Sequence, residues 1–224
     1  MPDTSDYTHI SVPRYPINDM RSRAQAYYQA LSTRRSIRDF QDKDIPLDII
    51  EQCIKTASEA PNGANLQPWH FVVVKDKALK HRIRLAAEEE ERSFYSERAS
   101  EEWLEDLATL GTDADKSFID EASALIVVFA QRYGLKEDGS KKKHYYVNES
   151  VGIAIGFLIS ALHYAGIGCL THTPSPMNFL GEILGRPKNE TAYLNLVIGY
   201  PAEDVRVPRH ALEKKPLSDI LTVH

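Results

Sequence analysis

Apolar residues recur at helical spacing in several stretches of the chain. Residues 22–33 read as a helix, and Pro46 opens a second helix with apolar residues three and four apart. A third, long helix is expected to end near residue 98, and a fourth covers residues 148–165. A short helix is expected between the last two strands.

Four other stretches are continuously apolar, which is typical of strands buried on both faces. They are HFVVVKD, SALIVVFA, GIGCLTHT and AYLNLVIGYP. PNGANLQP, residues 61–68, reads as a turn-rich loop and GSKKKHYYV as a charged loop. Helices that outnumber such strands indicate a central sheet covered by helices, an α/β or α+β sandwich.

The most apolar helix contains Gly152 and Gly156 as G-x-x-x-G. This spacing lets a second helix backbone approach closely, either within the core or across a subunit interface, and the two alternatives stay open. The same stretch is barely long enough to span a membrane and includes Ser160, His163 and Tyr164. A buried core helix therefore fits better than a membrane span.

Composition narrows the classes of partner. The 224 residues include 27 Lys and Arg against 32 Asp and Glu, a net charge of −5, so nucleic acid is not expected as a partner. Cys53 and Cys169 stand far apart, and neither a disulfide framework nor a metal site is expected. The first residues lack a secretory signal, which favours a cytoplasmic location and no membrane.

Candidate chemistry lies in three segments. TRRSIRDF carries arginines that suit phosphate oxygens, although cations at a helix C-terminus would look the same. APNGANLQPW can present free N–H groups or be a plain connection. THTPSP places hydroxyls at the end of an apolar strand, where open sheets often bind ligands. Common nucleotide, zinc-protease and serine-hydrolase motifs are absent from the sequence.

The order of RRSIRDF, APNGANLQPWHFVVV, GCLTHTP and LVIGYP resembles the flavin-dependent nitroreductase superfamily. EEEERSFY, KKKHYYVNES, LGRP and KKPLSDI are similar to its iodotyrosine deiodinase branch, and the resemblance covers residues 32–222. It implies an α+β, three-layer sandwich with a central mixed sheet covered by helices. It also implies an intertwined homodimer with FMN at the interface.

The resemblance divides the chain into an N-terminal arm (1–20), an FMN-binding domain (21–202) with a lid at about 88–120, and a C-terminal extension (203–224) that wraps the partner subunit. Animal deiodinases begin with a membrane anchor, and a soluble form without one is expected here.

The resemblance also implies which residues bind FMN. The arginine segment would hold the phosphate, ribityl chain and ring edge, the 61–68 loop would approach from the other subunit, and residues 170–173 would line the ring. The Thr173 hydroxyl would lie near flavin N5, where a donor favours one-electron chemistry. Asn62 and Lys214 replace residues common in the family. The residues implied are Arg34, Arg35, Ser36, Ile37, Arg38, Asn62, Gly63, Thr171, His172, Thr173 and Lys214.

A halotyrosine would be bound, by the same resemblance, through four residues. The Ala64 N–H would donate to the phenolate and so activate the carbon that carries iodine. Glu91 would bind the ammonium, Lys116 the carboxylate, and Tyr95 would hydrogen-bond to the same tail. Residues 88–90 are expected to form a solvated helix face, and without the resemblance Lys116 would be a solvated loop lysine.

The implied function is FMN-dependent reductive deiodination of mono- and diiodotyrosine to tyrosine and halide, with an unidentified electron donor or reductase. The alternative is a general NAD(P)H-dependent nitroreductase or quinone reductase on the same fold. A third hypothesis is a flavoprotein that binds halotyrosine as a sensor without turnover.

Overall fold

The computed structural model describes residues 7–98 and 113–224. The chain forms two compact units, Met1–Arg34 and Arg35–His224. The first contains helix α1 (Ile17–Ser32), which starts five residues before the predicted position and in which none of the residues is buried. Within this unit, the Arg23 guanidinium lies 4.2 Å from the centroid of the Tyr15 ring. The first unit therefore has little core of its own.

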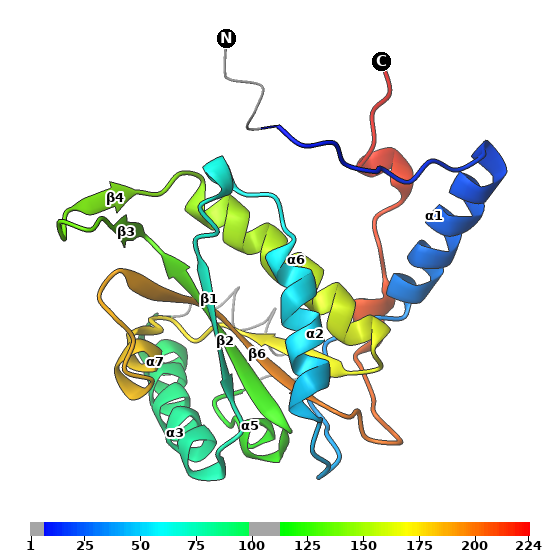
Figure 1. Ribbon diagram of the computed structural model, residues 1–224. Coiled ribbons are helices and arrows are strands. Elements are labelled where there is room, and N and C mark those ends of the chain that lie inside the picture. Colours follow the sequence, from blue (N-terminus) through cyan, green and yellow to red (C-terminus); the bar gives the residue numbers. More distant parts are fainter. Residues whose placement is uncertain (1–6, 99–112) are drawn as a thin grey trace. The chain divides into compact units, whose positions relative to one another are not determined.

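A four-stranded sheet forms the centre of the second unit (Figure 1). Its strands lie in the order β1 (Trp69–Val74), β2 (Ala124–Gln131), β6 (Glu190–Gly199) and β5 (Gly168–His172). These strands pair antiparallel throughout. A parallel bridge between Ser36 and Cys169 extends the sheet beyond β5, so the edge strand is flanked by the arginine segment.

Helices cover both faces of this sheet (Figure 1). Ala124, Ile126, Val128 and Ala130 of β2 pack on one side with α2 (Leu47–Ser58) and α6 (Val147–Tyr164). Leu125, Val127 and Phe129 pack on the other side with α3 (Lys77–Ser93), α5 (Phe118–Glu121) and α7 (Asn178–Ile183). Strand residues alternate between faces, so a strand buried on both sides is apolar at every position. The predicted α+β, three-layer sandwich is confirmed.

The prediction of a charged loop after β2 is partly wrong, because residues 141–143 of that stretch form one strand of a hairpin. Strand β3 (Tyr133–Leu135) pairs antiparallel with β4 (Lys141–Lys143). Gly139, with φ of 78°, lies in the turn, and the Lys141 ammonium lies 4.3 Å from the Tyr133 ring centroid. Lysines suit such a strand because both faces of a two-stranded ribbon are wet.

Helix α6 is a core helix along one side only. Val151, Ala154 and Leu158 are fully buried, whereas Gly152 and Gly156 are exposed. A Cβ added at Gly156 would meet nothing within 4 Å in the described chain, so the core-packing role for this glycine is wrong. Among the described residues, α6 is the helix long and apolar enough to cross a membrane, a test that core helices also pass.

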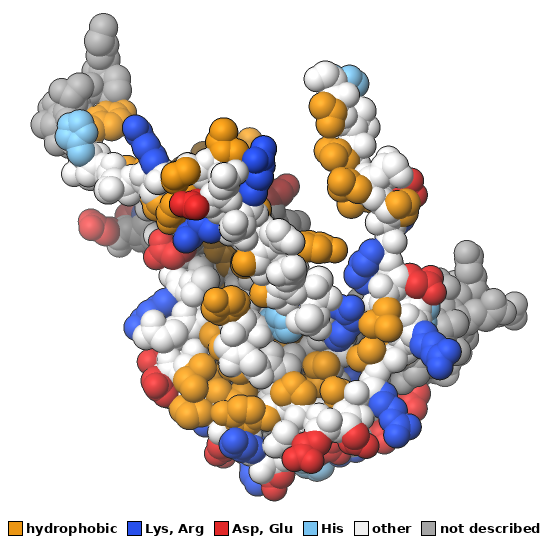
Figure 2. All heavy atoms as spheres, turned by 90° about the vertical axis from the view of Figure 1, so that its right-hand side faces the viewer, with side chains coloured by type: hydrophobic (Ala, Val, Ile, Leu, Met, Phe, Trp, Pro, Cys, Tyr) orange, Lys and Arg blue, Asp and Glu red, His pale blue; other side chains and the backbone are white. Residues whose placement is uncertain are grey.

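Short 3-10 helices complete the second unit: η2 (Gly63–Asn65), η4 (Arg209–Leu212) and η5 (Leu217–Asp219). Helix α3 runs on into a π-helical turn, η3 (Phe94–Arg98), so the predicted long helix is confirmed as far as residue 98, the last position described before the gap. The C-terminal tail exposes Leu217, Ile220 and Val223. Figure 2 shows apolar side chains at several places on the face that it presents.

Candidate active site

Two of the predicted segments meet at the outer edge of β5. The Ile37 N–H donates to the Cys169 carbonyl at 3.1 Å, which holds the arginine segment alongside the strand. The Ile37 side chain is buried in the core, so Ile37 can face a ligand only through its backbone. Thr171 and Thr173 are exposed at this edge, and Arg35, Ser36 and Arg38 are half-buried in the neighbouring segment. Guanidinium and hydroxyl donors are thus gathered along one strand.

Two further predicted FMN-binding residues, Arg34 and Lys214, make hydrogen bonds within their own segments. Arg34 belongs to the first unit, where its N–H donates to the Leu31 carbonyl at 3.1 Å. Lys214 is exposed in the tail, and its ammonium donates to the carbonyls of Ala211 (2.9 Å) and Glu213 (3.0 Å). A flavin contact by Lys214 would exchange these local bonds.

The loop over residues 61–68 has an unusual backbone. Ala64, Asn65 and Gln67 have φ of 54°, 52° and 47°, a left-handed region that costs energy for residues other than glycine and is frequent at functional sites. The loop borders a polar hollow of about 500 Å³, lined by Ser58, Glu59, Ala60, Pro61, Asn62, Asn65 and Gln67.

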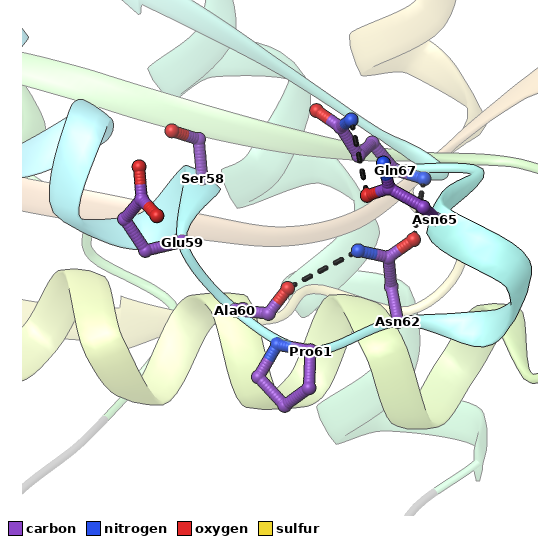
Figure 3. A pocket seen from close by; sticks show the side chains of 7 residues that line it. All are labelled: Ser58, Glu59, Ala60, Pro61, Asn62, Asn65 and Gln67. Atoms are coloured by element: carbon purple, nitrogen blue, oxygen red, sulfur yellow. Dashed lines mark hydrogen bonds between the residues drawn. The ribbon is translucent and has the colours of Figure 1, made fainter. Parts of the chain in front are cut away.

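Asn62 fixes the shape of this loop (Figure 3). Its Oδ1 accepts from the Gln67 N–H at 2.7 Å, and its Nδ2 donates to the Ala60 carbonyl at 3.1 Å. A serine could not span both partners, which explains what asparagine contributes here. Gly63 is also required by space, because a Cβ there would lie 2.7 Å from the Tyr145 carbonyl oxygen.

A buried cluster of charged and titratable groups lies on the α3 side of the sheet. Lys116 Nζ is 3.6 Å from Glu91 Oε2, and His172 Nε2 is 3.7 Å from Glu91 Oε1. The side chains of Glu91, Lys116 and His172 are 15%, 3% and 7% exposed. Lys116 is therefore a buried lysine, and the solvated-loop alternative is wrong.

The cluster sets the charges of its members. Burial alone would raise the pKa of Glu91, but the nearby His172 and Lys116 outweigh it and the pKa is lowered. Burial lowers the pKa of His172, the charge of Lys116 lowers it further, and Glu91 only partly opposes them. At neutral pH Glu91 is thus a carboxylate and His172 a neutral imidazole.

A second network anchors the backbone of Lys116. The Lys116 N–H donates to Glu88 Oε1 at 3.0 Å, and the same oxygen accepts from Arg84 at 2.7 Å. Arg84 also forms an ion pair with Asp120 of α5, at 3.0 Å. Glu88 is buried, so the predicted solvated face is wrong at this position, whereas Glu89 remains exposed.

Arg84→Gln should lower the free energy of unfolding by about 2 kcal/mol at pH 7, because it leaves the buried Glu88 carboxylate without its ion pair. Burial would raise the pKa of Glu88, but Arg84 and the Lys116 N–H outweigh it and lower that pKa. The stabilisation is therefore present above the unfolded pKa and lost as pH falls through the folded one. Urea unfolding should show the difference from wild type shrinking below about pH 4.3.

Arg92→Gln on the same helix is the matched control. Arg92 pairs with Glu89 at 2.6 Å, but both side chains are mostly exposed. Its loss should cost less than about 0.5 kcal/mol. Equal costs for the two variants would show that Arg84 does not anchor this segment.

Tyr95 lies one turn after Glu91, in the π-helical turn η3, and is half-buried. Its ring packs edge-to-face on Phe94 with centroids 5.6 Å apart. The predicted lid, residues 88–120, falls partly outside the described residues, since positions 99–112 are not described. What the structure describes of it is the end of α3 and the segment that holds Lys116.

The side chain of His172 points away from the exposed face of β5 on which Thr171 lies. Alternation along β5 turns Thr171 outward and His172 inward, toward Glu91. Asn195 lies opposite His172 in the β5–β6 register and is buried. The period of two in GCLTHT was the signal that could have found this orientation.

The sheet, its two helical layers and the donor-rich edge define a nitroreductase-like α+β protein. The model described as the Nitroreductase family matches residues 31–200. An iodotyrosine deiodinase of Haliscomenobacter hydrossis is 51% identical over 206 residues, 92% of each chain. Human iodotyrosine deiodinase 1 is 42% identical over 219 residues, 96% of this chain and 74% of the human one.

Among solved structures, an oxidised iodotyrosine deiodinase bound to FMN and 3-iodo-L-tyrosine matches with a TM-score of 0.70 and 31% identity. The match covers 79% of this chain and 90% of that one. The chain belongs to the nitroreductase family and, within it, to the iodotyrosine deiodinases.

Proposed function

We propose that the protein removes iodine reductively from mono- and diiodotyrosine. The C–I bond is replaced by a C–H bond, two electrons and one proton are consumed, and iodide leaves. The observation that carries the substrate is the buried Glu91–Lys116 pair at 3.6 Å. An isolated carboxylate and an ammonium held side by side complement the ammonium and carboxylate of a free amino acid.

The donor set at the β5 edge fits FMN. Arg35 and Arg38 can pair with a phosphate, and Ser36, Thr171 and Thr173 offer hydroxyls to a ribityl chain and a ring edge. Arg34 and Lys214 complete the proposed contacts, together with Ile37 and His172 through their backbones. FMN, when bound and reduced, supplies the electrons.

The protein's own residues place the substrate. The Ala64 N–H donates to the phenolate oxygen from the strained loop, and the charge on that oxygen activates the iodine-bearing carbon. The substrate ammonium replaces Lys116 on Glu91, and Lys116 turns to the substrate carboxylate. Tyr95 hydrogen-bonds to the same tail. Binding therefore exchanges an internal ion pair for two pairs with the ligand.

Anaerobic titration of the dithionite-reduced, FMN-loaded protein tests this function. Diiodotyrosine should reoxidise the flavin, followed by its absorbance, while tyrosine should not. Fast reoxidation by a nitrophenol but not by diiodotyrosine would favour the nitroreductase or quinone reductase alternative. Tight diiodotyrosine binding without reoxidation would favour the sensor.

We also propose a cytoplasmic homodimer served by a separate reductase. Support comes from apolar surface that a lone chain leaves open: α1 has no buried residue, α6 exposes Ile153 and Phe157, and the tail exposes Leu217 and Ile220. Cys53 and Cys169 are buried and form no disulfide within the described residues, which suits a reducing compartment. A monomer by sedimentation of the FMN-loaded protein would contradict the dimer.

A further inference from the structure

His172 contacts the predicted ammonium-binding residue from inside the protein. Its Nε2 faces Glu91 Oε1 at 3.7 Å, while Lys116 faces the other oxygen, Oε2, at 3.6 Å. Within the described residues neither ring nitrogen of His172 has a hydrogen-bond partner, and the residue is buried. A buried imidazole with unsatisfied nitrogens costs free energy, so its position calls for a compensating role.

We propose that His172 is a positioning residue of the amino-acid clamp: it holds one oxygen of the Glu91 carboxylate while the other oxygen passes from Lys116 to the substrate ammonium. The inference rests on the proposed function, because it concerns the residue that would bind the zwitterion. Without a second contact, the Glu91 side chain would be free to rotate when Lys116 leaves it.

The surroundings of His172 fix its ring. Phe118 of α5 packs edge-to-face on it, with centroids 5.9 Å apart and an interplanar angle of 89°. Glu91 reaches it from α3, Lys116 from the segment before α5, and Asn195 lies opposite on β6. Glu91 is the anion among these groups. The neutral ring therefore carries its proton on Nε2, which faces that carboxylate.

The contact also bears on pH. Burial raises the pKa of Glu91, and the interaction with His172 is the largest influence that lowers it. Removal of the imidazole should therefore raise the pKa of Glu91. Because only the carboxylate attracts the substrate ammonium, iodotyrosine affinity should then begin to fall at a higher pH than in wild type.

The test uses oxidised, FMN-loaded protein and flavin fluorescence quenching by two ligands, 3-iodotyrosine and 2-iodophenol, which lacks the zwitterion. His172→Val should raise the Kd for iodotyrosine about tenfold relative to that for iodophenol, since it removes the polar group that faces the charged Glu91 carboxylate at 3.7 Å. His172→Gln retains an N–H donor of similar reach and should recover most of the preference. As the pH is lowered, the affinity for iodotyrosine should begin to fall at a higher pH in the valine variant than in wild type.

His81→Gln is the matched control, because His81 also faces a carboxylate, Asp120 at 2.9 Å, but lies outside the cluster. It should leave the ligand preference unchanged. The proposal would be overturned if His172→Val left the preference for iodotyrosine over iodophenol unchanged, or if the valine and glutamine variants lost equal amounts of it. If His172→Val does not fold, His172→Leu replaces it. A wild-type protein that does not prefer iodotyrosine over iodophenol would instead overturn the proposed function.

Discussion

Glu91→Gln should weaken binding of 3-iodotyrosine to the FMN-loaded protein by about a hundredfold, the loss typical of removing one partner of a buried charge pair. Glutamine keeps the shape of the side chain and removes its charge. The substrate ammonium would then enter a buried site with no anion to pair with it. Flavin fluorescence quenching measures the affinity directly.

Glu89→Gln controls for the loss of one negative charge on the same helix. Glu89 is exposed and pairs with Arg92, so its variant should bind iodotyrosine within about twofold of wild type. Similar losses of iodotyrosine affinity in both variants would mean that the negative charges of the helix attract the substrate only at long range, and that Glu91 does not bind the ammonium.

Lys116→Gln should weaken iodotyrosine binding by about thirtyfold, because the substrate carboxylate loses its buried cation. The same change should leave the affinity for 3-iodotyramine, which has the ammonium but no carboxylate, unchanged or tighter. The reason is that Lys116 no longer competes for Glu91, which it faces at 3.6 Å. Glu91→Gln, by contrast, should weaken the binding of both ligands.

Lys142→Gln is the control for lost positive charge, since Lys142 is exposed on the hairpin strand β4. It should bind both ligands as wild type does. If Lys116→Gln weakened the binding of iodotyramine as much as that of iodotyrosine, Lys116 would maintain the structure of the site and would not bind the substrate carboxylate.

Much of the fold follows from periodicity in the sequence. Strand β2 is apolar at seven consecutive positions because it is buried between two helical layers, and the pattern predicts this. The hairpin of β3 and β4 was missed because its strands are only three residues long and β4 is all lysine. In so short a ribbon, cross-strand contacts such as Lys141 on Tyr133 decide the structure, and no periodic signal reports them.

The surroundings of the site residues were harder to predict from the sequence pattern than the fold. Glu88 and Glu91 are identical residues in one run of four glutamates. The Lys116 N–H, in the segment before α5, donates to Glu88, whereas the Lys116 ammonium and His172 of β5 face Glu91. Only tertiary contacts distinguish them from the exposed Glu89. The resemblance to known deiodinases singled out Glu91 and Lys116, but the direct pairing between them and the inward His172 follow from the fold.

The most direct test of the central claim is product analysis after a single anaerobic turnover. Dithionite-reduced, FMN-loaded protein would be mixed with 3-iodotyrosine, and iodide and tyrosine measured. One iodide and one tyrosine for every two electrons taken from the flavin is the predicted result. Flavin that stays reduced, or that is reoxidised without release of iodide, would contradict the assignment as a deiodinase.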